Sequence, residues 1–315
     1  MRIGFLVDAT CDLPDHYYSS GQVLVMPIGI RIGEQMLTDE RNAEVTTGFL
    51  DSDATGDASQ AETSAFDAEQ IRALFLERLV LEYDYVFCLT VTRERSQIHE
   101  NATQASFGIL NDYHSVREAA GMTTPFSLRV IDTGSVFAGQ GIPVLAGLAM
   151  REAGEQPPLI RARVADVANR THAYAVLPDL YYLRNRARKK GEKSVGLVGA
   201  MLGSALDLKP ILHANQGQTR PVAKVRGFEA AIGKLFAETA RAIREGGLLV
   251  PAVNLSYGGP LQRVHDFPGY AELAQACQDN GIELLESLMS LTGIINLGPG
   301  ALTLAYARAD APRLS

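Results

Sequence analysis

Cysteine is scarce in this 315-residue sequence: Cys11, Cys88 and Cys277 are three isolated thiols without a CxxC pair. This odd, scattered count argues against a disulfide framework and predicts a reducing compartment. The sequence also lacks an apolar run of about 18 residues, which excludes a membrane-spanning helix. Asp8 follows the first strand-like run directly, a pattern that excludes a signal peptide. We therefore expect a cytoplasmic protein.

An excess of positive charge is also missing. The 29 basic and 36 acidic residues give a net charge of −7. Because phosphate neutralisation supplies most of the affinity of a general nucleic-acid binder, we expect no nucleic-acid partner. The one dense basic segment, residues 184–190, has two interpretations: a solvated helix end, or a docking patch for an acidic partner or an anionic membrane surface.

The common catalytic and cofactor motifs are absent as well. The sequence has no HxH, HExxH or Cys/His pairing that would indicate a metal site. It has no GxGxxG or GxxxxGK[ST] motif for a dinucleotide or a triphosphate. Ser204 comes closest to the nucleophile of a GxSxG elbow but lacks the second glycine. We therefore expect no metal, no cofactor and no hydrolase triad.

What is present is an alternation of strand-like and helical segments, which is typical of an α/β fold. Residues 1–155 are predicted to form an α/β domain with a parallel sheet, and residues 156–315 a mixed-sheet α+β domain. The boundary is placed where the pattern breaks, at residues 154–158. The expected strands are 2–8, 23–32, 85–91, 127–132, 207–214, 218–225, 248–256, 282–285 and 301–307, and the expected helices are 67–81, 96–120, 139–152, 227–245 and 261–280.

Hydroxyl side chains follow several of the expected strands of the first domain. Each of them fits the ordinary role of a helix N-cap. Four such loops at one sheet edge would instead line a small anion site, better suited to a carboxylate or phosphate than to a cation. The hydroxyls concerned are Thr10, Thr63, Ser64, Thr92, Ser96, Thr133 and Ser135.

Near the end of the chain, Asn296 precedes Gly298-Pro299-Gly300. The two glycines and the proline form either an ordinary turn or a close approach of backbone to another group. Asn296 is a polar side chain at the point where a domain interface would place a ligand contact.

Read together, these segments resemble the DegV family, the fatty-acid-binding B subunits of bacterial fatty acid kinase. Asp8-Ala9-Thr10-Cys11-Asp12-Leu13-Pro14 is similar to the family's DSTSDLP opening. Thr63-Ser64 resembles the start of its TSQPS motif. Further matches in family order are Pro27-Ile28-Gly29-Ile30 with Asp39, Ile131-Asp132-Thr133, Leu208-Lys209-Pro210-Ile211-Leu212, Lys224-Val225-Arg226-Gly227 and Gly298-Pro299-Gly300-Ala301.

The resemblance implies two α/β domains with an acyl chain in an apolar tunnel and its carboxylate near the domain interface. Thr63, Ser64, Ser96, Arg188 and Asn296 are the residues it assigns to the carboxylate. The sequence departs from the family at three of these places. The glycine and threonine after Ser96 are missing, both glycines beside Arg188 are gone, and Asn296 replaces a histidine. Candidate tunnel residues are Phe5, Ile28, Ile30, Phe66, Phe75, Phe107, Leu110 and Ile295.

The leading hypothesis is thus a non-enzymatic carrier that binds a long-chain fatty acid. The resemblance further implies a kinase subunit as partner, transient membrane contact and a place in phospholipid metabolism. Two alternatives stay open: a small-molecule phosphotransferase or acyl hydrolase on the same scaffold, and a lipid-responsive interaction protein that switches a partner contact.

Overall fold

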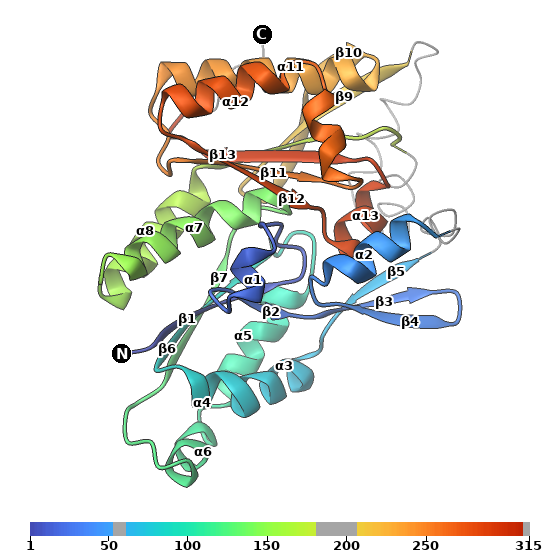
Figure 1. Cartoon of the computed structure of the whole chain (residues 1–315). Helices are drawn as coiled ribbons and strands as arrows, with labels where there is room; N and C mark the ends of the chain where they lie inside the picture. The colour runs from blue at the N-terminus through green and yellow to red at the C-terminus, as the bar shows by residue number, and fades with distance from the viewer. Residues whose placement is uncertain (53–60, 181–206, 311–315) are drawn as a thin grey trace.

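A computed structural model of the chain describes residues 1–52, 61–180 and 207–310. In this part of the chain the strands form three sheets: a four-stranded parallel sheet, a six-stranded mixed sheet and a three-stranded antiparallel sheet. Figure 1 shows the mixed sheet in the upper half of the molecule and the parallel sheet in the lower half, with helices α7 (Ala138–Glu152) and α8 (Pro157–Asn169) between them. This is the α/β fold predicted from the sequence, with a parallel first sheet and a mixed second sheet.

The parallel sheet has the order β2-β1-β6-β7. Its strands are β2 (Leu24–Met26), β1 (Ile3–Asp8), β6 (Tyr85–Thr90) and β7 (Ser127–Asp132). Alternate residues of each strand point to opposite faces. One face packs Leu6 and Cys88 under α3 (Ala68–Leu74) and α5 (Ile98–Gly108). The other packs Phe5 and Phe87 against α7 and α8, which lie between the sheets.

The prediction of a single strand over residues 23–32 is wrong. The segment is divided at Pro27 into β2 and β3 (Ile28–Ile32). Proline has no N–H to continue a strand ladder, and the chain leaves the parallel sheet there. β3 instead forms the centre of the small sheet β4-β3-β5, with β4 (Gln35–Asp39) and β5 (Glu62–Ala65).

Two predicted helices are interrupted, and a third, 67–81, is helical without a break but changes type. The segment 67–81 contains a π-helical stretch (Phe75–Leu79) between α3 and α4 (Val80–Glu82). The segment 96–120 consists of α5 and α6 (Tyr113–Ala119), and the segment 261–280 of a 3-10 turn (Leu261–Asp266) and α12 (Tyr270–Asp279). Pro268 and Gly269 account for the last break, because proline disfavours helical backbone before it and Gly269 has a left-handed φ of 81°.

The mixed sheet has the order β10-β9-β8-β13-β11-β12. The predicted hairpin between β9 and β10 is confirmed, and its turn residues Gln216 and Gly217 both have positive φ, at 48° and 76°, as a two-residue hairpin turn requires. One face of the sheet is covered by α11 and α12. The bounds are β8 (Thr171–Val176), β9 (Leu208–Asn215), β10 (Gln218–Arg226), α11 (Phe228–Glu245), β11 (Ala252–Tyr257), β12 (Glu283–Leu288) and β13 (Leu302–Ala307).

The two sheets share a helical layer. α7 (Ala138–Glu152) contacts β1 and β6 of the parallel sheet and β8, β11 and β13 of the mixed sheet, and it packs against α8 (Pro157–Asn169). The division into residues 1–155 and 156–315 falls between these two helices and stays a prediction.

A fourth apolar cluster joins the small antiparallel sheet to the second half of the chain. It contains Ile30 of β3, Phe49 of α2 (Ala43–Leu50), and Ile294 and Ile295 of α13 (Leu291–Leu297). Figure 1 shows α13 beside α2, above the β3–β5 sheet. The short helix α1 (His16–Ser19) follows β1. Across the described ranges, none of the helices combines the length and the apolar character needed to cross a membrane.

Candidate functional site

Thr63 and Ser64 lie next to each other on β5, and strand geometry turns them to opposite faces. Thr63 pairs with Ile30 of β3 and Ser64 pairs with Gly29. Residues directly opposite in an antiparallel pair share a face, so Thr63 lies on the face of the buried Ile30. Ser64 is exposed, and its Oγ lies 3.5 Å from the Gly29 carbonyl oxygen.

Gly29 is suited to its place beside Ser64 because it has no side chain. A Cβ at this position would lie 2.7 Å from Ser64 Oγ, which is closer than a Cβ carbon comes to another heavy atom. The Pro27-Ile28-Gly29-Ile30 motif therefore leaves room for the serine hydroxyl.

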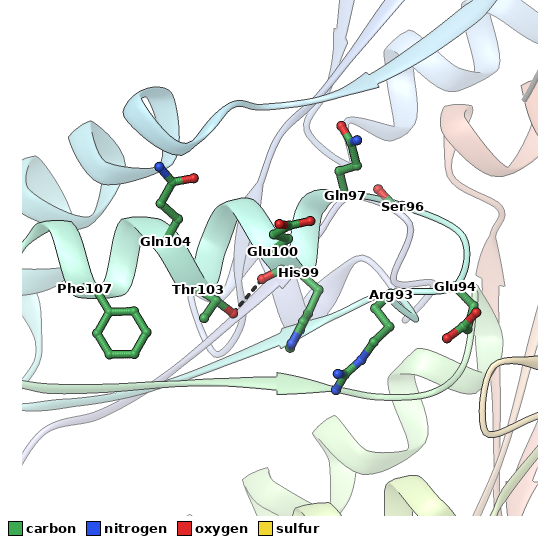
Figure 2. Close-up of a pocket in the computed structure, with 9 residues that line it drawn as sticks. All are labelled: Arg93, Glu94, Ser96, Gln97, His99, Glu100, Thr103, Gln104 and Phe107. Carbon is green, nitrogen blue, oxygen red and sulfur yellow. Dashed lines mark hydrogen bonds between the residues drawn. The ribbon is translucent and has the colours of Figure 1, made fainter.

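Ser96 lies in the loop between β6 and α5 and is half-buried. Its Oγ accepts a hydrogen bond of 3.2 Å from the Ile98 N–H, which is the helix-start role expected of an ordinary loop serine. Ser96 also lines an open hollow of about 610 Å³ along α5. Figure 2 shows its lining residues, which extend from Arg93 and Glu94 to Phe107.

The hollow has a mixed polar character. His99 lines it, and its Nδ1 lies 3.0 Å from Thr90 Oγ1. Burial lowers the pKa of His99, more than Asp132 raises it, so the imidazole is neutral at pH 7. Glu94 and Glu100 add negative charge, and Arg93 is paired with Asp132 at 2.7 Å. The hollow thus provides hydroxyl and amide groups rather than spare positive charge.

The loop of Ser96 and strand β5 belong to one neighbourhood. Asn101 of α5 donates from Nδ2 to the Phe66 carbonyl at 2.8 Å, and Phe66 directly follows β5. Helices α3 and α5 pack against each other beside this bond. The end of β5 therefore lies close to α5, the helix that begins after the Ser96 loop, while Thr63 and Ser64 face opposite sides of β5.

Asn296 lies on α13, which contacts β5. It is half-buried, and its Nδ2 donates to the Thr292 carbonyl at 2.7 Å. A carboxamide has two N–H groups, so one remains for another acceptor. The helix that carries Asn296 thus contacts the strand that carries Thr63. Arg188 and the basic segment 184–190 lie outside the described residues.

Of the other hydroxyls at the sheet edge, those of Thr10 and Thr133 bond the protein itself, whereas the buried Ser135 Oγ has no hydrogen-bond partner among the described residues. Thr10 donates from Oγ1 to the Asp8 carboxylate at 2.5 Å, and that carboxylate also accepts from the Val91 N–H at 2.6 Å and from Gln140 Nε2 at 3.1 Å. Thr133 donates to the Thr90 carbonyl at 2.8 Å. At the centre of the edge these groups therefore bond one another.

A buried polar cluster at the junction of the two halves was not predicted. The Asp12 carboxylate accepts from Arg41 Nη1 at 2.9 Å, from the Ser290 N–H at 2.9 Å and from Ser256 Oγ at 2.6 Å. Asp39 accepts from the Thr292 N–H at 2.7 Å. Burial raises the pKa of Asp12, and Arg41 opposes that shift. Asp12 and Asp39 occur in motifs seen in the sequence, but nothing in their spacing reveals that both reach α13.

The apolar layer between the parallel sheet and helices α3 and α5 contains part of the predicted tunnel set. Ile28 and Phe75 are buried in it and Phe66 packs against it. Phe5 lies on the opposite face of the sheet, and Phe107 is 68% exposed. Ile30 and Ile295 belong to the cluster around α13, and Leu110 is exposed. The eight residues therefore do not form one wall.

Solved structures resemble this fold over its whole length. The fatty acid binding protein DegV of Bacillus subtilis has a TM-score of 0.73 at 18% identity and covers 98% of this chain and 99% of its own. A stearic acid-binding protein of Eubacterium ventriosum has a TM-score of 0.75 at 18% identity, with 97% and 98% covered. At these identities the likeness establishes the fold.

The sequence comparisons establish the family. The model described as "Uncharacterised protein, DegV family" matches residues 2–309. A DegV domain-containing protein of Xanthomonas campestris is 55% identical over 307 residues, which are 98% of each chain. Together with the matching fold, these findings show that this chain belongs to the DegV family.

Proposed function

We propose that this chain binds a long-chain fatty acid and acts as its carrier. The observation that carries the proposal is the full-length match in fold to DegV proteins whose names describe fatty acid or stearic acid binding. The hydroxyls of Thr63, Ser64 and Ser96, which neighbouring segments carry, support it from within this chain, because neutral donors satisfy a carboxylate that leaves water.

The acyl chain is proposed to lie in the apolar layer under α3 and α5. This layer is lined by Ile71, Phe75, Leu79 and Ile98, all fully buried. Each methylene moved from water into such a layer contributes about 0.8 kcal/mol, so a long chain offsets the entropy cost of binding. The π-helical stretch Phe75–Leu79 lies over this layer, and π-helical turns often occur at functional sites.

The carboxylate is proposed to lie between β5, the loop of Ser96 and α13. Thr63, Ser64, Ser96 and Asn296 supply its neutral donors, and Arg188 is proposed as its positive partner. The charge of Arg41 is already matched by Asp12 at 2.9 Å, which supports giving the ion-pair role to Arg188. A carrier that leaves the carboxylate at a junction of domains is suited to presenting it to a kinase subunit.

The test is mass spectrometry of the purified protein, under native and then denaturing conditions, after incubation with C14–C18 fatty acids. We expect one acid per chain, released on denaturation. Ser96→Ala should lower the occupancy, whereas Ser115→Ala should not, because Ser115 is exposed on α6 and bonds only the Asp112 carbonyl. A protein that stays free of acid at saturating concentration would contradict the proposal, and turnover of an acyl or phosphoryl substrate would favour the enzyme alternative.

A further inference from the structure

The hydroxyl of Thr292 is a buried donor without a partner. Thr292 is 3% exposed, and its Oγ1 forms no hydrogen bond with any described residue. A buried polar group normally has a partner, and leaving it without one is costly. Threonine in a helix usually bonds the carbonyl four residues back. Thr292 is only the second residue of α13, so the carbonyl four residues back belongs to Leu288 at the end of β12, outside the helix, where it accepts from Arg41 Nη2 at 2.9 Å.

The backbone around this hydroxyl is already satisfied. The Thr292 N–H donates to Asp39 at 2.7 Å, and the Gly293 N–H donates to Ser290 Oγ at 3.0 Å. The Thr292 carbonyl accepts from Asn296 Nδ2 at 2.7 Å. The N–H groups of Thr292 and Gly293 are therefore not free to bind an anion. The Thr292 hydroxyl is the group at this position that still lacks a partner.

Thr292 and Asn296 lie one helical turn apart, on the same face of α13. Asp39, which holds the Thr292 N–H, pairs with Ile28 on the sheet face that also carries Thr63. The residue with the unpartnered hydroxyl is thus bonded to Asn296 and, through Asp39, to the sheet that carries Thr63. Figure 1 shows how α13 is placed over this small sheet.

We propose that Thr292 is a further head-group ligand, whose hydroxyl donates to the carboxylate of the bound fatty acid, and that Asp39 positions it. This inference rests on the proposed function. It explains why a buried hydroxyl is kept on a helix whose residues Leu291, Ile294 and Ile295 belong to an apolar cluster: the bond that satisfies it forms only when the acid is bound.

The test is Thr292→Val, which removes the hydroxyl and keeps the shape. We expect opposite effects on two measurements. The acid-free protein should melt higher, by about 2–4 °C, because an unsatisfied group is gone. The affinity for a fluorescent C18 fatty acid should fall about tenfold, because the bound carboxylate loses a donor. Thr292→Ser should restore the affinity.

Thr239→Val is the matched control. Thr239 is also buried in a helix, but its Oγ1 donates to the Leu235 carbonyl at 2.9 Å. Its removal should lower the melting temperature and leave the affinity unchanged. Unchanged affinity in Thr292→Val, with binding intact in the wild type, would overturn the inference alone. Absence of binding in the wild type would instead contradict the proposed function.

Discussion

Asp8 ends β1 with a carboxylate that is fully buried and is bonded to no cation within the described ranges. Burial raises its pKa, although four hydrogen bonds oppose the shift. The folded chain then holds a proton that the unfolded chain releases above its ordinary pKa of about 3.9. The free energy of unfolding contributed by Asp8 is therefore largest below that pH and falls as the pH rises through the folded pKa. The asparagine of Asp8→Asn has no carboxyl proton to lose. The loss of unfolding free energy caused by this substitution, measured by urea unfolding, should therefore be smaller at pH 8 than at pH 4.

Asp84 supplies a control of opposite sign. Burial works against its ionisation, but hydrogen bonds from Arg2 and Arg117 outweigh it and lower the pKa. Its contribution is present above the unfolded pKa and is lost as the pH falls. The cost of Asp84→Asn should therefore grow with pH. Parallel pH trends in the two variants would contradict the assignment of Asp8 as a proton-holding group.

At the scale of elements, the pairing of β8 with β9 contains two buried imidazoles. His172 Nδ1 lies 3.0 Å from His213 Nε2, and His172 Nε2 lies 3.3 Å from the Arg308 carbonyl. That carbonyl only accepts, so His172 donates from Nε2 and accepts from His213 at Nδ1. Burial lowers the pKa of both imidazoles. For His213, burial together with the nearby His172 and Arg220 lowers the pKa to about 4.

The unfolded histidines have a pKa of about 6.5, so the unfolded chain binds more protons below that pH. The contribution of the pair is complete above pH 6.5 and is lost as the pH falls toward 4. We expect His213→Gln to lower the melting temperature at pH 8 but to flatten its decline between pH 7 and pH 5. His114→Gln, on the exposed surface of α6, should leave that decline unchanged. An unchanged slope in His213→Gln would contradict the prediction.

The same hairpin illustrates what the sequence was able to predict. Asn215-Gln216-Gly217 between two apolar runs encodes a turn locally, and the structure has it. β5 was not predicted because Glu62–Ala65 is short and polar and becomes a strand only by pairing with β3. For the candidate site, the sequence predicted that Thr63 and Ser64 take part in binding. Their opposite faces depend on strand pairing, and the bond from Thr292 to Asp39 joins residues 253 positions apart, which no local pattern specifies.

At the scale of the whole molecule, the Asp12–Arg41 pair joins the start of the parallel sheet to the mixed sheet. The side chains are 0% and 7% exposed, and their bonds reach Ser256, Ser290 and Leu288 of the second half. Removing one partner of a buried pair leaves an uncompensated charge and costs about 3–5 kcal/mol. Arg41→Met and Asp12→Leu should each cost this much, and the double variant should cost clearly less than their sum.

Chemical denaturation of the four proteins measures this coupling. The ion pair Arg31–Glu62 lies on the small sheet near the same junction, and both of its side chains are about half exposed. A double-mutant cycle on this pair is the matched control. Water screens such a pair, so its coupling should stay below about 1 kcal/mol. Additive costs for Asp12 and Arg41 would contradict the prediction. A large coupling would mean that the two halves depend on each other for stability, because the charge of each residue is tolerated in the interior only while the other half supplies its partners.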